Sequence, residues 1–157
     1  MNAFQLYAQK LEANPNIPPE IAQYFKLLFL NIELSSEQGA AFDAWLYASK
    51  ANDRLCDRML KFSHTKIGKS LTREQQIQEV AAYATITPRA LELLDKFFQE
   101  IATGEEKDEI DEWLHESGAN DLLFDLLLES GDWGSKSETI HMLRKLISQA
   151  NTGIFPV

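Results

Sequence analysis

The sequence of 157 residues contains one cysteine, Cys56, and no long apolar run. A single cysteine excludes an internal disulfide and a cysteine-rich metal site. Its apolar runs, such as those at 27–30 and 126–128, are far shorter than the roughly 20 residues that a membrane helix needs. The first residues also lack the basic start and apolar core of a secretory signal. These absences predict a cytoplasmic protein with no membrane segment in this chain.

Strand signals are missing as well. No window alternates apolar and polar residues convincingly with a period of two, and clusters of β-branched residues are absent. Apolar side chains recur instead at the spacing of one helical face, as in Ile21, Phe25 and Leu28. The chain is therefore predicted to be all-α, with eight or nine short helices, the last of them within 135–147.

Negative charge is concentrated in the second half of the chain. Residues 1–70 hold eight Lys/Arg and seven Asp/Glu, a net charge of +1, whereas residues 71–157 hold seven and seventeen, a net charge of −10. Such a surface repels nucleic acid and anionic membranes and attracts a basic protein partner. The alternative is that the charge only keeps a small protein in solution.

A helical segment is duplicated. Residues 35–60 align without a gap on residues 103–128 at an offset of 68, and 11 of these 26 positions are identical. Four residues recur as helix caps in this interpretation: Ser35 and Thr103 open capping boxes, and Asn52 and Asn120 cap the helices that follow. The pattern predicts two small tandem units packed together, 1–70 and 71–157.

Each copy carries a tryptophan on an apolar helical stripe. The spacing predicts that six residues belong to the cores: Phe42, Trp45, Leu46, Ile110, Trp113 and Leu114. The exposed edge of either tryptophan could instead anchor an interface. The acidic start of the second copy provides the candidate partner-binding residues Glu105, Glu109 and Glu112. Carboxylates there also favour the helix dipole, so a solvated face is the competing interpretation.

Signals for catalysis are weak. Two Glu-x-x-His pairs, Glu112/His115 and Glu138/His141, have the spacing found in di-iron helical bundles, but the first pair falls on the polar side of its helix. The segment 68–70 resembles the end of a phosphate-binding loop without its earlier glycine or preceding strand. Cys56 lies on an apolar stripe, where a thiol is usually inert. We therefore expect no enzyme, no cofactor and no metal.

The duplicated pattern is a capped helix start, a spaced Trp-Leu, then Ser-x-x-Asn and an apolar helix. The second copy shows it at Thr103, Gly104, Glu106, Ile110, Trp113, Leu114, Ser117, Asn120 and Phe124, and the first at Leu34, Ser35, Glu37, Phe42, Trp45, Leu46, Ser49 and Asn52. This pattern resembles the N-terminal cytoplasmic region of FecR-type anti-sigma regulators. The sequence departs from that family in having two units and no following membrane helix or sensor domain.

The resemblance implies binding of an extracytoplasmic-function sigma factor, in an anti-sigma-like role in transcription regulation. The residues and the resemblance together predict a non-catalytic protein-interaction module whose acidic helix docks on a basic partner. Two alternatives stay open at this point. The chain could be a homo-oligomeric structural adaptor, or a di-metal carboxylate enzyme built on the Glu-x-x-His pairs.

Overall fold

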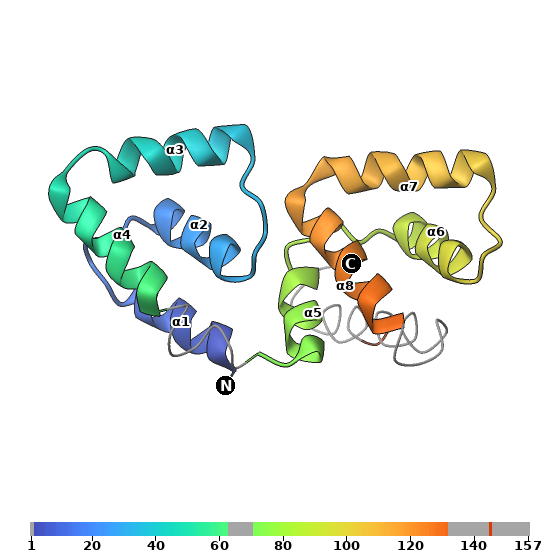
Figure 1. Cartoon of the computed structure of the whole chain (residues 1–157), viewed down its shortest axis with the longest axis horizontal. Helices are drawn as coiled ribbons and strands as arrows, with labels where there is room; N and C mark the ends of the chain where they lie inside the picture. The colour runs from blue at the N-terminus through green and yellow to red at the C-terminus, as the bar shows by residue number, and fades with distance from the viewer. Residues whose placement is uncertain (1, 63–70, 132–144, 146–157) are drawn as a thin grey trace. The chain divides into compact units, whose positions relative to one another are not determined.

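A computed structural model describes residues 2–62, 71–131 and 145. Over these residues the chain forms α-helices and no strand, which confirms the all-α prediction (Figure 1). The helices are α1 (Ala3–Glu12), α2 (Pro19–Phe29), α3 (Ser36–Leu46), α4 (Lys50–Phe62), α5 (Arg73–Ala81), α6 (Pro88–Phe98), α7 (Gly104–Glu116) and α8 (Gly118–Gly131). The additional helix expected within 135–147 lies outside the described residues, apart from the single position 145.

The chain divides into two compact units, Met1–Glu79 and Val80–Val157. We call these the first and the second unit. The boundary between them falls inside α5, whereas the sequence placed it after residue 70. Within each unit, helices that follow one another in the chain pack on one another: α1 on α2, α2 on α3 and α3 on α4, then α6 on α7 and α7 on α8.

The first unit has an aromatic core. Phe25 is fully buried and meets Phe42 and Trp45 edge to face, with ring centroids 5.3 and 6.0 Å apart, which joins α2 to α3. Tyr7 stacks on Phe29 at 4.7 Å, and its hydroxyl donates to the carbonyl of Met59 at 3.4 Å. Edge-to-face pairs add to the stabilisation from burial alone. Aromatic contacts thus join α1 and α3 to α2, and the Tyr7 hydroxyl adds a hydrogen bond from α1 to α4.

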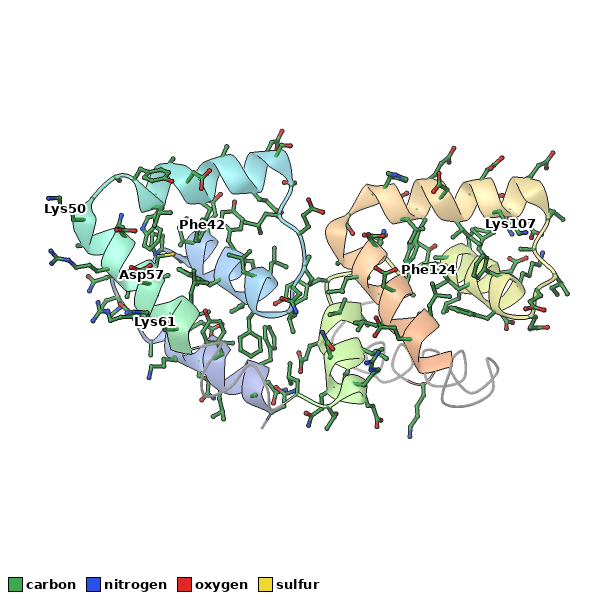
Figure 2. All side chains as sticks on the ribbon, viewed as in Figure 1. Phe42, Lys50, Asp57, Lys61, Lys107 and Phe124 are labelled. Atoms are coloured by element: carbon green, nitrogen blue, oxygen red, sulfur yellow. The ribbon has the colours of Figure 1, made fainter. Side chains whose placement is uncertain are left out.

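The second unit has a more aliphatic core. Its fully buried side chains include Leu94, Leu123 and Leu127. Aromatic contacts are found between α6 and α8, where Phe124 lies 5.3 Å from Phe97 and 6.0 Å from Phe98 (Figure 2). Burial of such side chains stabilises each by about 1.5–3 kcal/mol relative to exposure. The same helical arrangement is therefore filled with different side chains in the two units.

The duplication extends beyond the 26 aligned residues. Asn31 and Glu100 both have a left-handed backbone, with φ of 66° and 62°, just after α2 and α6. They are 69 residues apart rather than 68. The loop from Asn31 to the cap Ser35 has one residue more than the loop from Glu100 to the cap Thr103. This single extra residue hides the similarity of α2 and α6 from an alignment without gaps.

Two of the four predicted caps are confirmed and two are corrected. Ser35 and Thr103 form capping boxes, with Gln38 and Glu106 completing them. Asn52 and Asn120 lie inside α4 and α8, so they are not the caps of these helices. The hydroxyls of Ser49 and Ser117 take that role and accept from the backbone N–H of Asn52 and of Asn120, both at 3.1 Å.

Candidate functional site

The acidic face of α7 is the first candidate site. Glu105, Glu109 and Glu112 are all exposed, and their spacing places them on one side of the helix. The full helix carries seven Asp/Glu and one Lys, a net charge of −6. A neighbouring side of α7 packs into the second unit through Ile110 and Trp113, which are buried. The predicted surface residues and the buried core residues therefore lie on different, adjoining sides of one helix.

Glu109 is already engaged within the second unit. Its two carboxylate oxygens accept from the guanidinium of Arg89 on α6, at 2.8 and 3.1 Å, and Arg89 also pairs with Glu92 at 3.2 Å. The hydrogen bonds from Arg89 lower the pKa of Glu109. Such a fork is stronger than a single contact. Glu109 thus holds α7 against α6. Of the three predicted partner-binding residues, those whose exposed carboxylates remain for a partner are Glu105 and Glu112.

Glu106 and Lys96 form a second tie between these helices, which the sequence did not reveal. The ammonium of Lys96 lies 2.6 Å from the carboxylate of Glu106, whose other oxygen accepts from the backbone N–H of Thr103 at 3.0 Å. Glu106 is only 9% exposed. The hydrogen bond from Lys96, followed by that from Thr103, lowers the pKa of Glu106 to about 2. Glu106 therefore both caps α7 and holds α6.

Trp113 and Asn120 hold the loop before α6 through its main chain. The side-chain amide of Asn120 donates to the Trp113 carbonyl at 2.8 Å, and its oxygen accepts from the N–H of Thr85 at 2.8 Å. The indole N–H of Trp113 donates to the carbonyl of Thr85 at 2.7 Å. Asn120 and Trp113 together therefore hydrogen-bond both the N–H and the carbonyl of Thr85. We call this pair of side chains the Trp–Asn clamp.

The first unit repeats the clamp but leaves it empty. The amide of Asn52 donates to the Trp45 carbonyl at 2.7 Å, as Asn120 does to Trp113. Across residues 2–62 and 71–131, neither the indole N–H of Trp45 nor the side-chain oxygen of Asn52 has a hydrogen-bond partner. Both side chains are half-buried, whereas Trp113 is 7% exposed and Asn120 is fully buried. In both clamps the asparagine amide is bound to the tryptophan carbonyl, but among the described residues only the clamp of the second unit also binds the main chain of another residue.

The predicted core residues differ in burial within each unit. Phe42 is buried, like Ile110 and Trp113, whereas Trp45, Leu46 and Leu114 are half-buried. Trp45 therefore combines a ring that packs on Phe25 with an edge that reaches the surface. The contact with Phe25 agrees with the core interpretation of Trp45, and its role as an interface anchor stays a prediction.

A basic stripe on α4 is a further charged feature of the first unit. Lys50, Arg54, Arg58 and Lys61 are exposed and fall on one side of the helix, and Figure 2 shows Lys50 and Lys61 directed away from the unit. Two acidic residues on the same helix leave it a net charge of +2. In α8 the equivalent positions hold Gly118, Leu122, Leu126 and Glu129.

The candidate residues for metal and thiol chemistry are Glu112, His115 and Cys56. Glu112 and His115 are both exposed, and Glu138/His141 lies outside the described part of the chain. Within the described ranges no three His, Cys, Asp or Glu side chains converge as metal ligands would. Burial raises the pKa of the Cys56 thiol, which keeps it protonated and unreactive. His115 instead bonds to the Asp111 carbonyl at 2.7 Å, which raises its pKa.

None of the helices in the described part of the chain has the length and apolar character that crossing a membrane requires. Comparison with protein-family models, with curated proteins and with solved structures found no match to this chain.

Proposed function

We propose that this chain is a non-catalytic protein-interaction module that binds a basic protein surface through α7. The observation that carries the proposal is the division of α7 into an exposed acidic side and a side fixed in the second unit. The resemblance to FecR-type regulators supports an extracytoplasmic-function sigma factor as the partner. The chain would then act in the cytoplasm as an anti-sigma-like transcription regulator.

The bracing of α7 makes it a suitable docking platform. Lys96 and Arg89 attach its first turns to α6, and Asn120 attaches its last turn to α8. A helix held at both ends loses little conformational freedom on binding, so less of the interaction energy is spent on ordering it. Glu105, Asp108 and Glu112 are exposed along this braced helix. Their charges would steer a basic partner toward it.

Charge reversal on α7 tests the proposal with a matched control. Glu105→Lys with Glu112→Lys changes the net charge as much as Glu37→Lys with Asp43→Lys on α3, where both residues are also exposed. We expect the unaltered chain to recover a sigma factor from a lysate of its source at low salt and to lose it at high salt. The α7 variant should lose it, and the α3 variant should retain it. Equal recovery by both variants would show that α7 is not the docking surface.

The homo-oligomeric adaptor remains a second candidate because of the basic stripe on α4. A basic helix in one unit and an acidic helix in the other allow head-to-tail association between copies of the chain. Sedimentation at increasing concentration distinguishes the two candidates. Association that is weakened by salt and by reversal of Arg54 and Arg58, with no other protein recovered, would favour the adaptor.

A further inference from the structure

The occupied Trp–Asn clamp of the second unit defines the ligand that such a clamp accepts. Thr85 offers its N–H to the oxygen of Asn120 and its carbonyl to the indole of Trp113, at 2.8 and 2.7 Å. An extended residue presents both of these groups on the same side, as in an antiparallel strand pair. The clamp therefore reads main chain rather than a particular side chain.

The empty clamp of the first unit has the same donor and acceptor available to solvent. In the described part of the chain no buried side-chain nitrogen or oxygen lacks a hydrogen-bond partner. The unpaired indole N–H of Trp45 and the oxygen of Asn52 must therefore reach the surface. Asn52 is held in place by its bond to the Trp45 carbonyl, so the acceptor is oriented before any ligand binds.

The loop of the first unit explains why its own main chain leaves the clamp empty. Asn16 precedes the cap of α2 by two residues, as Thr85 precedes the cap of α6. The N–H of Asn16 donates instead to the side chain of Asn14, at 2.9 Å. Pro15 and Pro18 in the same loop have no N–H to offer. A local turn has thus withdrawn the donor that Thr85 supplies in the second unit.

We propose that the first unit binds an extended segment of a partner polypeptide, one residue of which is held between Trp45 and Asn52. The N–H of that residue donates to the oxygen of Asn52, and its carbonyl accepts from the indole of Trp45. A small side chain such as that of threonine suits the clamped position, because Thr85 occupies it in the second unit. This site is distinct from the acidic face of α7 and does not depend on it.

A peptide copied from the second unit provides the probe. The acetylated and amidated segment Ala82–Pro88, AYATITP, is titrated into the full ¹⁵N-labelled chain while the indole N–H signals are followed. Trp45→Phe and Trp113→Phe identify the two signals. We expect the Trp45 signal to shift to saturation and the Trp113 signal to stay in place, because Trp113 is already bound to Thr85.

Methylation of the peptide backbone tests the hydrogen bond without altering the protein. An N-methyl group at the Thr85 position removes the donor to Asn52 and should weaken binding about tenfold, equivalent to about 1.4 kcal/mol. An N-methyl group at the Ile86 position is the control, since its N–H points to the other side of an extended chain. That control peptide should bind as well as the parent. Reversing the charges of Glu105 and Glu112 should leave the affinity of the chain for the parent peptide unchanged. This result would separate the peptide site from the proposed function.

Three results would overturn the proposal. The Trp45 signal could fail to saturate at the highest soluble peptide concentration. The two methylated peptides could bind equally well. In the free chain, the Trp45 indole proton could exchange with solvent as slowly as that of Trp113, which would mean that the chain closes its own clamp.

Discussion

The two units differ most in how they join the second helix of each unit to the third. In the first unit, Phe25 on α2 meets Phe42 on α3 through their rings. In the second unit the equivalent residues, Leu94 and Ile110, are aliphatic. Ion pairs from Lys96 and Arg89 to α7 are added there. One helical plan is therefore stabilised by aromatic contacts in one copy and by aliphatic packing with ionic ties in the other.

The difference extends to the charge that each unit displays. The ionic ties require carboxylates on α7, and further carboxylates on the same helix are left exposed. The first unit has no such requirement, and its α3 carries only Glu37 and Asp43 as charged residues. The outer side of α4 instead carries four basic residues of the first unit, Lys50, Arg54, Arg58 and Lys61. The two units thus differ both in how their helices pack and in the sign of the charge that α4 and α7 expose.

The largest expected effect comes from exchanging the residues at equivalent positions of α8 and α4. Phe124 fills the space beside Phe97 and Phe98, whereas its counterpart Cys56 is a small buried residue. Phe124→Cys should lower the free energy of unfolding of the second unit by about 3 kcal/mol, because it leaves a cavity. Urea unfolding followed by amide hydrogen exchange in α8 measures this loss.

The reverse exchange sharpens the same comparison. Cys56→Phe inserts a ring into a site packed around a thiol and should destabilise the first unit by about 1–3 kcal/mol. Exchange of α4 amides measures the effect separately from α8. If Cys56→Phe were neutral, the first unit would contain room for a ring and the two cores would be less different than the structure shows.

The clamps predict an unequal response to the same substitution. Asn120→Ala removes the partners of Thr85 and Trp113 in a fully buried site and should cost about 2 kcal/mol. Asn52→Ala removes one bond at a half-buried site and should cost about 1 kcal/mol or less. Hydrogen exchange of the amides in each unit reports both values. Equal losses would indicate that the first clamp is as fully occupied as the second.

The sequence predicted the helices and the duplication better than it predicted the ties between helices. Capping boxes and apolar spacing are local signals, so Ser35, Thr103 and the tryptophan stripes could be identified from them. Asn52 and Asn120 were misassigned as caps because asparagine and serine both suit that position and only the observed hydrogen bonds distinguish them. The bond from Trp113 to Thr85 spans 28 residues and has no local signature.

The pairing of Glu106 with Lys96 was missed for a related reason. Thr103 was identified as the start of a capping box, and the role of Glu106 in that box is defined by neighbours in the same helix. Which residue faces it from another helix depends on how α6 and α7 pack. The equivalent positions in the first unit are Gln38 and Leu27, so the duplication also gave no hint of a charge there. An ion pair present in one copy alone cannot be inferred from the repeat.

That ion pair gives the last and smallest prediction, a difference in acid sensitivity. The pKa of Glu106 is about 2 in the folded chain, below its ordinary value of 4.5. A lowered folded-state pKa means that its contribution to stability is complete above the ordinary value and is lost as the pH falls from there toward 2. Glu106→Gln keeps the capping box and should remove this part of the acid sensitivity. Thermal unfolding between about pH 6 and about pH 2 should show a smaller fall in Tm for the variant, by a few degrees.

A matched substitution in the first unit isolates the role of Lys96. Gln38→Glu places a carboxylate at the equivalent cap, where Leu27 stands in the position of the lysine. The backbone N–H at the cap remains available to it, but no ammonium does. The variant should therefore gain less acid sensitivity than Glu106→Gln loses. If the two changes were equal in size, the low pKa of Glu106 would come from the helix cap alone and the ionic tie between α6 and α7 would contribute nothing measurable.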